Sequence, residues 1–302
     1  MIPVELRGVV RGVIPAVLTP LKDNQSIDFH RLGEYVDWLI KKGVHGLFPM
    51  GTNGEGVLFS TDERKEAAET VVGAAGARVP VIIHTGAAST GETIALTRHA
   101  KRVGASAAAV VAPFFLPHDD AALEAHFVAV AEAVPDFPIF LYNIPANAGN
   151  DIKPKVAAAV ARRCANVVGI KDSSKDLGRL QEYIATLGED FTVVVGSDAL
   201  IYPALLVGAA GVVSAVANVF PEAAVAIYEA VRTGDYEEGL RRQNELNRLR
   251  KALKIGPFIT PYKKALERLG FSIGGPRAPL REMTADEEQA MEKALQALNL
   301  LP

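Results

Sequence analysis

Short apolar runs alternate with amphipathic segments along most of this chain. Eight such runs precede residue 234, and each is followed by a stretch with apolar residues at helical spacing. The runs are rich in Val and Ile and do not alternate with polar residues, as expected of strands buried on both faces. They cover residues 13–18, 46–50, 81–84, 107–111, 139–143, 167–170, 193–195 and 211–214.

Repeated strand–helix units restrict the fold to a few α/β arrangements. Two Ser-x-x-Glu capping boxes, at 60–63 and 89–92, mark helix starts after the second and third runs. Eight units within about 220 residues are what a closed parallel barrel needs. We therefore predict an α/β fold, a (β/α)8 TIM barrel formed by residues 1–234.

The remaining residues change character, because helical patterns follow one another without apolar strand-like runs. Helices are predicted at 235–254, 262–269 and 284–298, the last opened by another capping box, Thr284 to Glu287. We expect residues 235–302 to be a C-terminal helical extension of the same domain.

Composition excludes several classes of protein. The chain has 302 residues, 49% hydrophobic, and a net charge of -3, so it can bury a large core and lacks the basic excess of a nucleic-acid or membrane binder. Cys164 is the only cysteine, which rules out a disulfide framework and fits a cytoplasmic location. No run reaches the ~18 apolar residues of a membrane span, and residues 1–12 lack the apolar core of a signal peptide.

Lys171 is the sharpest candidate for chemistry. It directly follows a Val-Val-Gly-Ile run, and side chains at the carboxyl ends of barrel strands face the active-site mouth. At an ordinary pKa, only about one lysine in a few thousand is neutral at pH 7. Burial would lower that pKa and make the amine a nucleophile. The alternative is a structural lysine paired with Asp172 or another carboxylate.

Two further features end or follow predicted strands. Tyr142 supplies a phenol that could relay protons, although it could equally be a packed rim residue. The turn at 51–54, Gly-Thr-Asn-Gly, could bind a carboxylate through successive backbone N–H groups, and the Thr52 hydroxyl could bond a tyrosine or that carboxylate. An ordinary turn between strand and helix is the alternative.

Other polar residues at strand ends are weaker candidates. His84 and Asp198 stand at such positions, but a single histidine there is more often a hydrogen-bonded core or rim residue. The six histidines form no His-x-x-x-His pair and have no neighbouring cysteine, and no phosphate-binding glycine motif is present. We therefore expect no protein-bound catalytic metal and no nucleotide-binding loop.

Four short motifs end or follow predicted strands in order: Gly-Thr-Asn-Gly-Glu at 51–55, Tyr-Asn-Ile-Pro at 142–145, Gly-Ile-Lys-Asp at 169–172 and Gly-Ser-Asp at 196–198. Together they resemble the motifs of the dihydrodipicolinate synthase/N-acetylneuraminate lyase family of class I aldolases. The resemblance covers nearly the whole chain and includes residues 208–219 and 275–280.

The resemblance implies roles for individual residues. Lys171 would form an imine with the 2-oxo group of the substrate, and Tyr142, assisted by Thr52, would relay protons. Thr52 and Asn53 would hold the substrate carboxylate, and the carbonyl of Val213 would face the site. Members of the family are usually homotetramers, dimers of dimers, and need no cofactor because the protonated imine is itself the electron sink.

Two positions depart from dihydrodipicolinate synthases. Asn147 stands where those enzymes usually have an arginine for the aldehyde partner, and Phe115 replaces a tyrosine that reaches a neighbouring subunit. A phenyl ring cannot relay a proton, and an amide cannot pair as a bidentate cation. The strings at 51–55 and 144–149 instead resemble 4-hydroxy-2-oxoglutarate aldolases, with 2-keto-3-deoxy sugar-acid aldolases and dehydratases also close. Asn147 and Ser197 join the candidate substrate-binding residues.

The leading hypothesis is a Schiff-base lyase acting on pyruvate or a pyruvate-derived 2-oxo acid through Lys171. One alternative is 4-hydroxy-tetrahydrodipicolinate synthase, which condenses pyruvate with aspartate semialdehyde. Another is a non-catalytic barrel that binds a 2-oxo acid, and a phosphate- or flavin-binding barrel has only Gly196-Ser197 in its favour. The second substrate and the direction of the reaction stay open.

Overall fold

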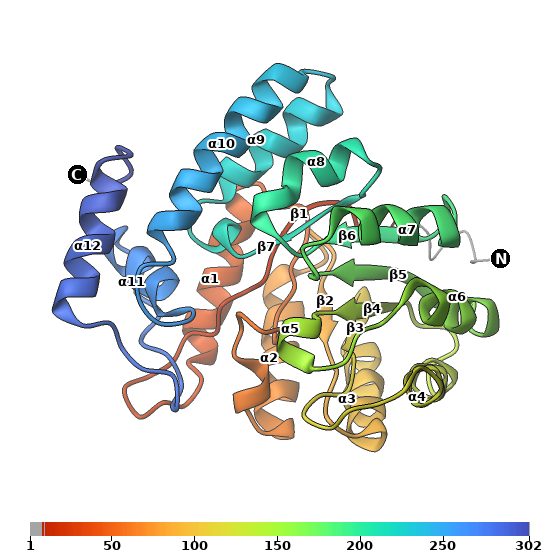
Figure 1. Cartoon of the computed structure of the whole chain (residues 1–302). Coiled ribbons are helices and arrows are strands. Elements are labelled where there is room, and N and C mark those ends of the chain that lie inside the picture. The colour runs from red at the N-terminus through yellow and green to blue at the C-terminus, as the bar shows by residue number, and fades with distance from the viewer. Residues whose placement is uncertain (1–7, 9, 302) are drawn as a thin grey trace.

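Parallel strands form a single curled sheet at the centre of the molecule (Figure 1). The computed structural model describes residue 8 and residues 10–301. Within them the sheet has seven strands in the order β1-β7-β6-β5-β4-β3-β2. The strands are β1 (Gly12–Pro15), β2 (Ile82–His84), β3 (Ala107–Val111), β4 (Ile139–Asn143), β5 (Val167–Asp172), β6 (Thr192–Val195) and β7 (Gly211–Ser214).

The strand predicted at residues 46–50 is wrong as a regular strand. Leu47 forms only an isolated parallel bridge, to Val81. Its backbone nevertheless lies between the two edge strands: Phe48 N donates to Pro15 O on the β1 side at 3.0 Å, and Ile82 N of β2 donates to Leu47 O at 2.8 Å. The described residues therefore show a TIM-barrel-like curled sheet with seven regular strands, not eight.

Pro49 and Met50 explain why no regular ladder forms there. Proline has no N–H to donate to a neighbouring strand. Met50 then adopts a left-handed φ of 59°, which turns the chain out of the extended conformation. The segment keeps a strand's position without a strand's regularity.

Helices cover the outside of the sheet (Figure 1). They are α1 (Phe29–Lys41), α2 (Thr61–Ala75), α3 (Thr90–Arg102), α4 (Asp120–Glu132), α5 (Pro145–Ala148), α6 (Pro154–Arg163), α7 (Leu177–Leu187), α8 (Ile201–Leu206) and α9 (Pro221–Arg232). The predicted capping box at Ser60 is confirmed at the start of α2. The box at Ser89 is only half formed, because the Glu92 carboxylate accepts from Thr61 Oγ1 at 2.8 Å instead of turning back to its own helix start.

The C-terminal region is helical, as predicted. It contains α10 (Tyr236–Ala252), α11 (Thr260–Arg268) and α12 (Ala285–Gln296), and in the described part of the chain no strand separates them. The capping box of Thr284 with Glu287 opens α12. Helix α10 packs along α9, so the loop that follows α10 reaches the carboxyl ends of the strands (Figure 1).

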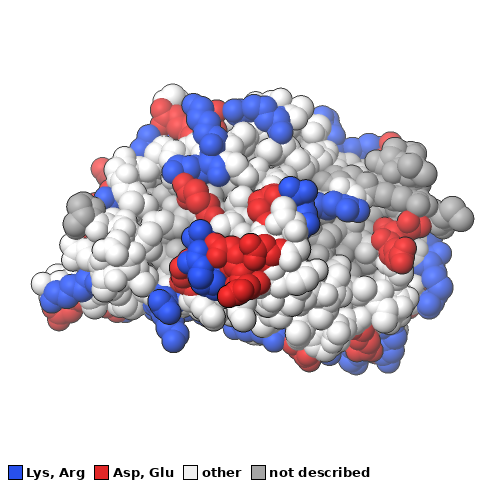
Figure 2. All heavy atoms as spheres, turned by 90° about the horizontal axis from the view of Figure 1, so that it is seen from above, with Lys and Arg blue, Asp and Glu red and all other residues white. Residues whose placement is uncertain are grey.

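The seven strands are buried along their whole length, and charges gather on the helices. Figure 2 shows basic and acidic side chains intermingled on the face seen from above. On α10, for example, Arg241 and Arg242 both pair with Glu238. Among the residues described, no helix is long and apolar enough to cross a membrane.

Candidate active site

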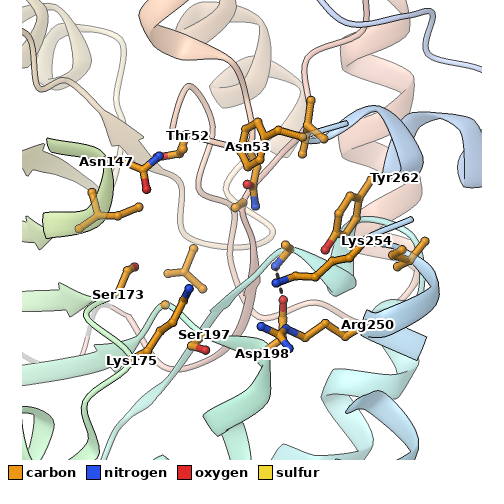
Figure 3. A pocket seen from close by; sticks show the side chains of 18 of the residues that line it. Thr52, Asn53, Asn147, Ser173, Lys175, Ser197, Asp198, Arg250, Lys254 and Tyr262 are labelled. Carbon is orange, nitrogen blue, oxygen red and sulfur yellow. Dashed lines mark hydrogen bonds between the residues drawn. The ribbon is translucent and has the colours of Figure 1, made fainter. Parts of the chain in front are cut away.

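One cavity of about 350 Å³ opens at the carboxyl ends of the strands. It brings together every residue predicted for the site: Lys171, Tyr142, Thr52, Asn53, Val213, Asn147 and Ser197. These residues come from separate strands and loops, so the fold alone assembles them. Figure 3 shows the labelled members of this set around the cavity.

Lys171 lies on β5 as the register partner of Tyr142 on β4, so both side chains point to the same face of the sheet. Its Nζ lies 3.8 Å from the centre of the Tyr142 ring and 4.1 Å from the centre of the Phe48 ring. The lysine is 5% exposed. Burial lowers the pKa of Lys171 to about 7, against the opposing charge of Asp198. A large fraction of the amine is therefore neutral at physiological pH.

The ion pair between Lys171 and Asp172, one alternative above, does not form. Successive strand residues face opposite sides, and the Asp172 carboxylate accepts from Asn143 Nδ2 at 2.9 Å and from Ser174 Oγ at 2.6 Å. Lys171 has no carboxylate within ion-pair distance in the part of the chain that the structure describes. Its immediate neighbours are aromatic faces.

A glycine makes room for the lysine stem. A Cβ on Gly196 would lie 1.9 Å from Ser173 Oγ and 3.1 Å from Lys171 Cε. The Gly-Ser-Asp motif therefore begins with glycine for a steric reason, because any side chain would displace Ser173 and crowd Lys171.

Tyr142 and Thr52 form the polar pair beside the amine. Thr52 Oγ1 and Tyr142 OH are 3.0 Å apart, and either can donate. Burial raises the pKa of Tyr142 to about 12, although hydrogen bonds from Thr52 and Ser173 oppose the shift. The phenol is thus neutral and can accept one proton while donating another.

The turn that carries Thr52 and Asn53 packs tightly against the segment that follows β1. Thr19 Oγ1 donates to Gly54 O at 2.6 Å. A Cβ on Gly54 would lie 2.7 Å from Val17 O, so only glycine fits there. Glu55, at the end of the turn, has a left-handed φ of 58°.

A fully buried ion pair holds Glu55 in that conformation. Lys263 Nζ on α11 lies 2.6 Å from Glu55 Oε1, and the two side chains are 1% and 0% exposed. Lys263 also donates to Thr19 O at 2.9 Å and to Gly275 O at 2.8 Å. Arg277 N donates to Glu55 Oε2 at 2.6 Å. The sequence motifs at 51–55 and 275–280 are thereby joined through a lysine that the motif reasoning did not select.

Of the two weaker candidates, one reaches the cavity and one does not. Asp198 lines it and accepts from Ser214 Oγ, Ala215 N and Val216 N. Burial raises the pKa of Asp198, and those hydrogen bonds oppose the rise. His84 is buried behind Tyr142, and its Nδ1 donates to a backbone carbonyl at 2.8 Å. Burial holds the pKa of His84 well below its ordinary value, which makes it a neutral core histidine.

Some charged and polar residues of the cavity come from segments that the sequence reasoning did not select. Arg250 and Lys254 belong to α10 and the loop after it, Tyr262 to α11, and Lys175 to the loop after β5. Figure 3 shows Lys254 and Lys175 extending into the cavity from different sides. Helical periodicity in the C-terminal region predicts the helices but not which end of them faces the site.

Phe115 lies outside the cavity of its own chain. It is 93% exposed and has a left-handed φ of 78°. Among the described residues, no group of three or more His, Cys, Asp or Glu side chains could hold a metal ion.

Known proteins resemble this chain over almost its full length. The profile of the dihydrodipicolinate synthetase family matches residues 9–298. A DapA-like lyase of Halobacterium salinarum, itself uncharacterised, is 42% identical over 97% of this chain and 95% of its own length. The 4-hydroxy-tetrahydrodipicolinate synthase of Methanopyrus kandleri is 39% identical over 97% and 98%.

A solved structure extends the likeness to three dimensions. YagE, a prophage protein of the dihydrodipicolinic acid synthase family from E. coli K12, was determined in complex with pyruvate. It superimposes with a TM-score of 0.92 at 31% identity, covering 96% of this chain and 99% of its own.

Proposed function

This chain belongs to the dihydrodipicolinate synthetase family of lyases, and we propose that it forms a Schiff base between Lys171 and pyruvate or a pyruvate-derived 2-oxo acid. The observation that carries the proposal is the environment of Lys171. Its buried amine has a pKa of about 7, faces two aromatic rings and lacks an ion-pair partner among the described residues. An amine held in this state is a nucleophile at neutral pH.

The geometry supports a defined order of steps. The neutral Lys171 amine attacks the 2-oxo carbon, and the carbonyl oxygen takes up a proton to give a carbinolamine. Loss of water then leaves a protonated imine. Tyr142, bonded to Thr52 at 3.0 Å, is the hydroxyl pair placed to move those protons.

In a 4-hydroxy-2-oxo acid, the imine makes carbon–carbon cleavage accessible. The electron pair of the C3–C4 bond enters the protonated imine and forms an enamine. The 4-hydroxyl loses its proton as C4 becomes an aldehyde. Protonation of C3 and hydrolysis of the imine release pyruvate and regenerate Lys171.

The substrate carboxylate is placed at the turn carrying Thr52 and Asn53. Backbone N–H groups of a tight glycine-flanked turn suit an anion, and the buried pair of Glu55 and Lys263 fixes that turn. Val213 and Ser197 line the same cavity and complete the proposed substrate contacts.

We favour a 4-hydroxy-2-oxoglutarate or 2-keto-3-deoxy sugar-acid substrate. Asn147 lines the cavity without the cation expected of a dihydrodipicolinate synthase, and Phe115 carries no hydroxyl. The alternative, 4-hydroxy-tetrahydrodipicolinate synthase, is supported by the name of the 39%-identical relative. A reductase-coupled assay with pyruvate and aspartate semialdehyde decides between them, because product formation at useful rates would reject our preference.

Reductive trapping tests the imine itself. Incubation with pyruvate and borohydride should add one reduced pyruvate to the chain, and peptide mapping should place it on Lys171. Lys171→Ala should abolish both the mass shift and turnover, whereas Lys251→Ala, on the exposed face of α10, should change neither. An unmodified wild-type mass would contradict the proposal. Stabilisation by pyruvate without turnover of any 2-oxo acid would instead indicate a binding protein.

We also propose that the chain works as a cytoplasmic homotetramer. The most exposed large apolar side chains include Phe115, Leu116 and Val57, and unpaired apolar surface of this kind favours self-association. Light scattering after size exclusion should give four times the 32.1 kDa chain mass. A monomer at micromolar concentration would contradict this.

Residues 235–302 are proposed to belong to the same domain as residues 1–234. The support is Lys263, which sits at 1% exposure against Glu55 in the site turn. A chain ending at residue 234 would lose the ion-pair partner of that carboxylate and expose the apolar surface that α10 and α11 cover, so it should fail to fold cooperatively. A cooperative thermal transition of the shortened chain would argue for two domains.

A further inference from the structure

Three cations line the cavity, Arg250 and Lys254 on one side and Lys175 on another (Figure 3). Arg250 and Lys254 come from the carboxyl end of α10 and the residue just beyond it, and Lys175 comes from the loop after β5. They are close enough to act on one another: burial, Arg250 and Lys175, in that order, lower the pKa of Lys254. The fold thus holds like charges together where they repel.

Carboxylates do not pair with these three cations. Within the described part of the chain, none of the three has a carboxylate within ion-pair distance. Some nearby cations are paired: Arg179 on α7 binds Asp151, and Arg242 on α10 binds Glu238. Among the described residues Arg248 and Lys251 of α10 also form no ion pair, but they do not line the cavity. What distinguishes the three cations is that they are unpaired and line the same cavity.

Asp198 offsets only part of the charge of the cluster: it raises the pKa of Lys254, against burial, Arg250 and Lys175. It is the only carboxylate among the residues that line the cavity. Its oxygens already accept from Ser214 Oγ and from two backbone N–H groups at the end of β7. Three cations and one carboxylate leave a surplus of two positive charges before Lys171 is counted.

The helix dipole explains part of the cluster but not its direction. A cation near a helix carboxyl end is stabilised by roughly 0.3–1 kcal/mol. Lys251 in the last turn of α10 supplies such a charge and does not line the cavity. The dipole gives no reason for Arg250 and Lys254 to face inward as well.

The far side of the cavity has the opposite character. Thr52, Asn53 and Asn147 lie there without a charged group, away from Arg250 and Lys254 (Figure 3). Thr52 and Asn53 are the proposed site for the carboxylate next to the 2-oxo group. A substrate with that single anion would leave the cluster across the cavity uncompensated.

We propose that Lys175, Arg250 and Lys254 form a second anion-binding position, which selects 2-oxo acids that carry a carboxylate or phosphate at the far end of the carbon chain. The inference rests on the proposed Schiff-base function and names its substrate class. It also assigns the distal anion to a different side of the cavity from Asn147, the position where an arginine is usual in dihydrodipicolinate synthases.

Three substrates test this position: two that differ only at the far end, and a shorter one that ends in a carboxylate. Pyruvate release is measured with 4-hydroxy-2-oxoglutarate, which ends in a carboxylate, and with 2-keto-3-deoxygluconate and its 6-phosphate, which end in a neutral hydroxymethyl group and in a phosphate. We expect kcat/KM at least ~30-fold higher for one of the anionic substrates than for the neutral one. The anionic substrate with the higher kcat/KM shows whether the position prefers a carboxylate or a phosphate.

Variants in and just after α10 separate a local contact from a general electrostatic field. Arg250→Met and Lys254→Met should each lower kcat/KM about 10- to 100-fold for the preferred anionic substrate, mainly through KM, and less than about threefold for the neutral one. Arg248→Met and Lys251→Met remove equal charge from exposed positions of the same helix outside this cavity and should change neither substrate.

Failure of this proposal is distinguishable from failure of the Schiff-base function. If pyruvate is trapped on Lys171 but the neutral substrate is used as well as the anionic ones, the second anion position is wrong and the imine stands. The same holds if cavity and control variants lose activity equally for all substrates. If pyruvate is not trapped at all, the proposed function fails and this inference fails with it.

Discussion

Two lysines in this protein are almost completely buried, and they lie in contrasting surroundings. Lys263, beneath the site turn, is held by the Glu55 carboxylate and two backbone carbonyls. Lys171, on the cavity floor, faces aromatic rings. Burial lowers the pKa of both. At Lys263 the charge of Glu55 and its hydrogen bond oppose that shift, whereas at Lys171 only the charge of the more distant Asp198 does.

The contrast shows that burial alone does not decide what a lysine does. A charged partner keeps a buried ammonium charged and makes it a structural tie. Without that partner, the charged form is disfavoured and a neutral amine results. This reactivity costs stability. The unfolded chain binds a proton at Lys171 up to its ordinary pKa, whereas burial disfavours that proton in the folded chain. The resulting loss of folding stability is largest below about pH 7 and shrinks as pH rises from about 7 toward 10.

The largest expected effect comes from removing the reactive lysine. Lys171→Met keeps the stem but not the amine, so turnover should fall at least ~10⁴-fold and pyruvate trapping should vanish. At pH 7 the same change should raise the free energy of unfolding, by on the order of a few kcal/mol, because a desolvated amine is replaced by an apolar group. Kinetics and urea unfolding measure the two. A variant both inactive and less stable would show that Lys171 is a structural residue.

Removing the paired lysine, Lys263, should lower the free energy of unfolding instead of raising it. Lys263→Met leaves the Glu55 carboxylate buried without a partner, which typically costs roughly 3–5 kcal/mol. The double variant Lys263→Met with Glu55→Gln should recover part of that loss. Lys264→Met, its neighbour with ion pairs nearer the surface, should cost about 1 kcal/mol or less. Equal losses for Lys263 and Lys264 in urea unfolding would mean that the buried pair contributes nothing special.

The difference between the two lysines also marks what could be predicted from sequence. Lys171 follows an apolar run, so strand periodicity and the barrel rule place it at the mouth. Lys263 carries no such signal, because its partner Glu55 lies in a distant turn and nothing local marks the pair. The sequence reasoning did not select Arg250 and Lys254 for a similar reason. Helical spacing predicts α10, but the packing of α10 on α9 determines which end of the helix reaches the cavity.

The error at residues 46–50 has a different origin. The apolar run there is real, and its backbone does lie between β1 and β2. Hydrophobicity indicates burial, whereas a regular ladder also needs N–H groups and extended dihedrals, which Pro49 and Met50 do not supply. Phe115 shows a further limit, since its 93% exposure depends on loop geometry that no periodic pattern encodes.

A smaller effect is expected from the hydroxyl pair beside Lys171. Tyr142→Phe retains the ring that packs on the lysine but removes the proton relay, so kcat should fall about 10²- to 10³-fold while the imine still forms slowly. Thr52→Val should cost less, because water can replace one hydrogen bond to the phenol. Single-turnover trapping with pyruvate measures imine formation separately from turnover. Wild-type rates in Tyr142→Phe would remove the phenol from the mechanism.

The smallest effect concerns the one carboxylate that acts on Lys171 without pairing with it. Imine formation should increase as pH rises through about 7, the pKa of Lys171, and then level off. The charge of Asp198 raises that pKa, so Asp198→Asn should move the midpoint to lower pH, by roughly 0.3 to 1 unit. Asp172→Asn is the matched control: its side chain faces the other side of β5, and the midpoint should stay in place. The readout is the pH midpoint of borohydride trapping rather than its rate, so a loss of stability in either variant does not imitate the shift. A midpoint that moves equally in both variants would mean that the pKa of Lys171 depends on the total charge of the barrel mouth and not on Asp198 in particular. The contrast with Lys263 would then rest on burial and not on the absence of a paired carboxylate at Lys171.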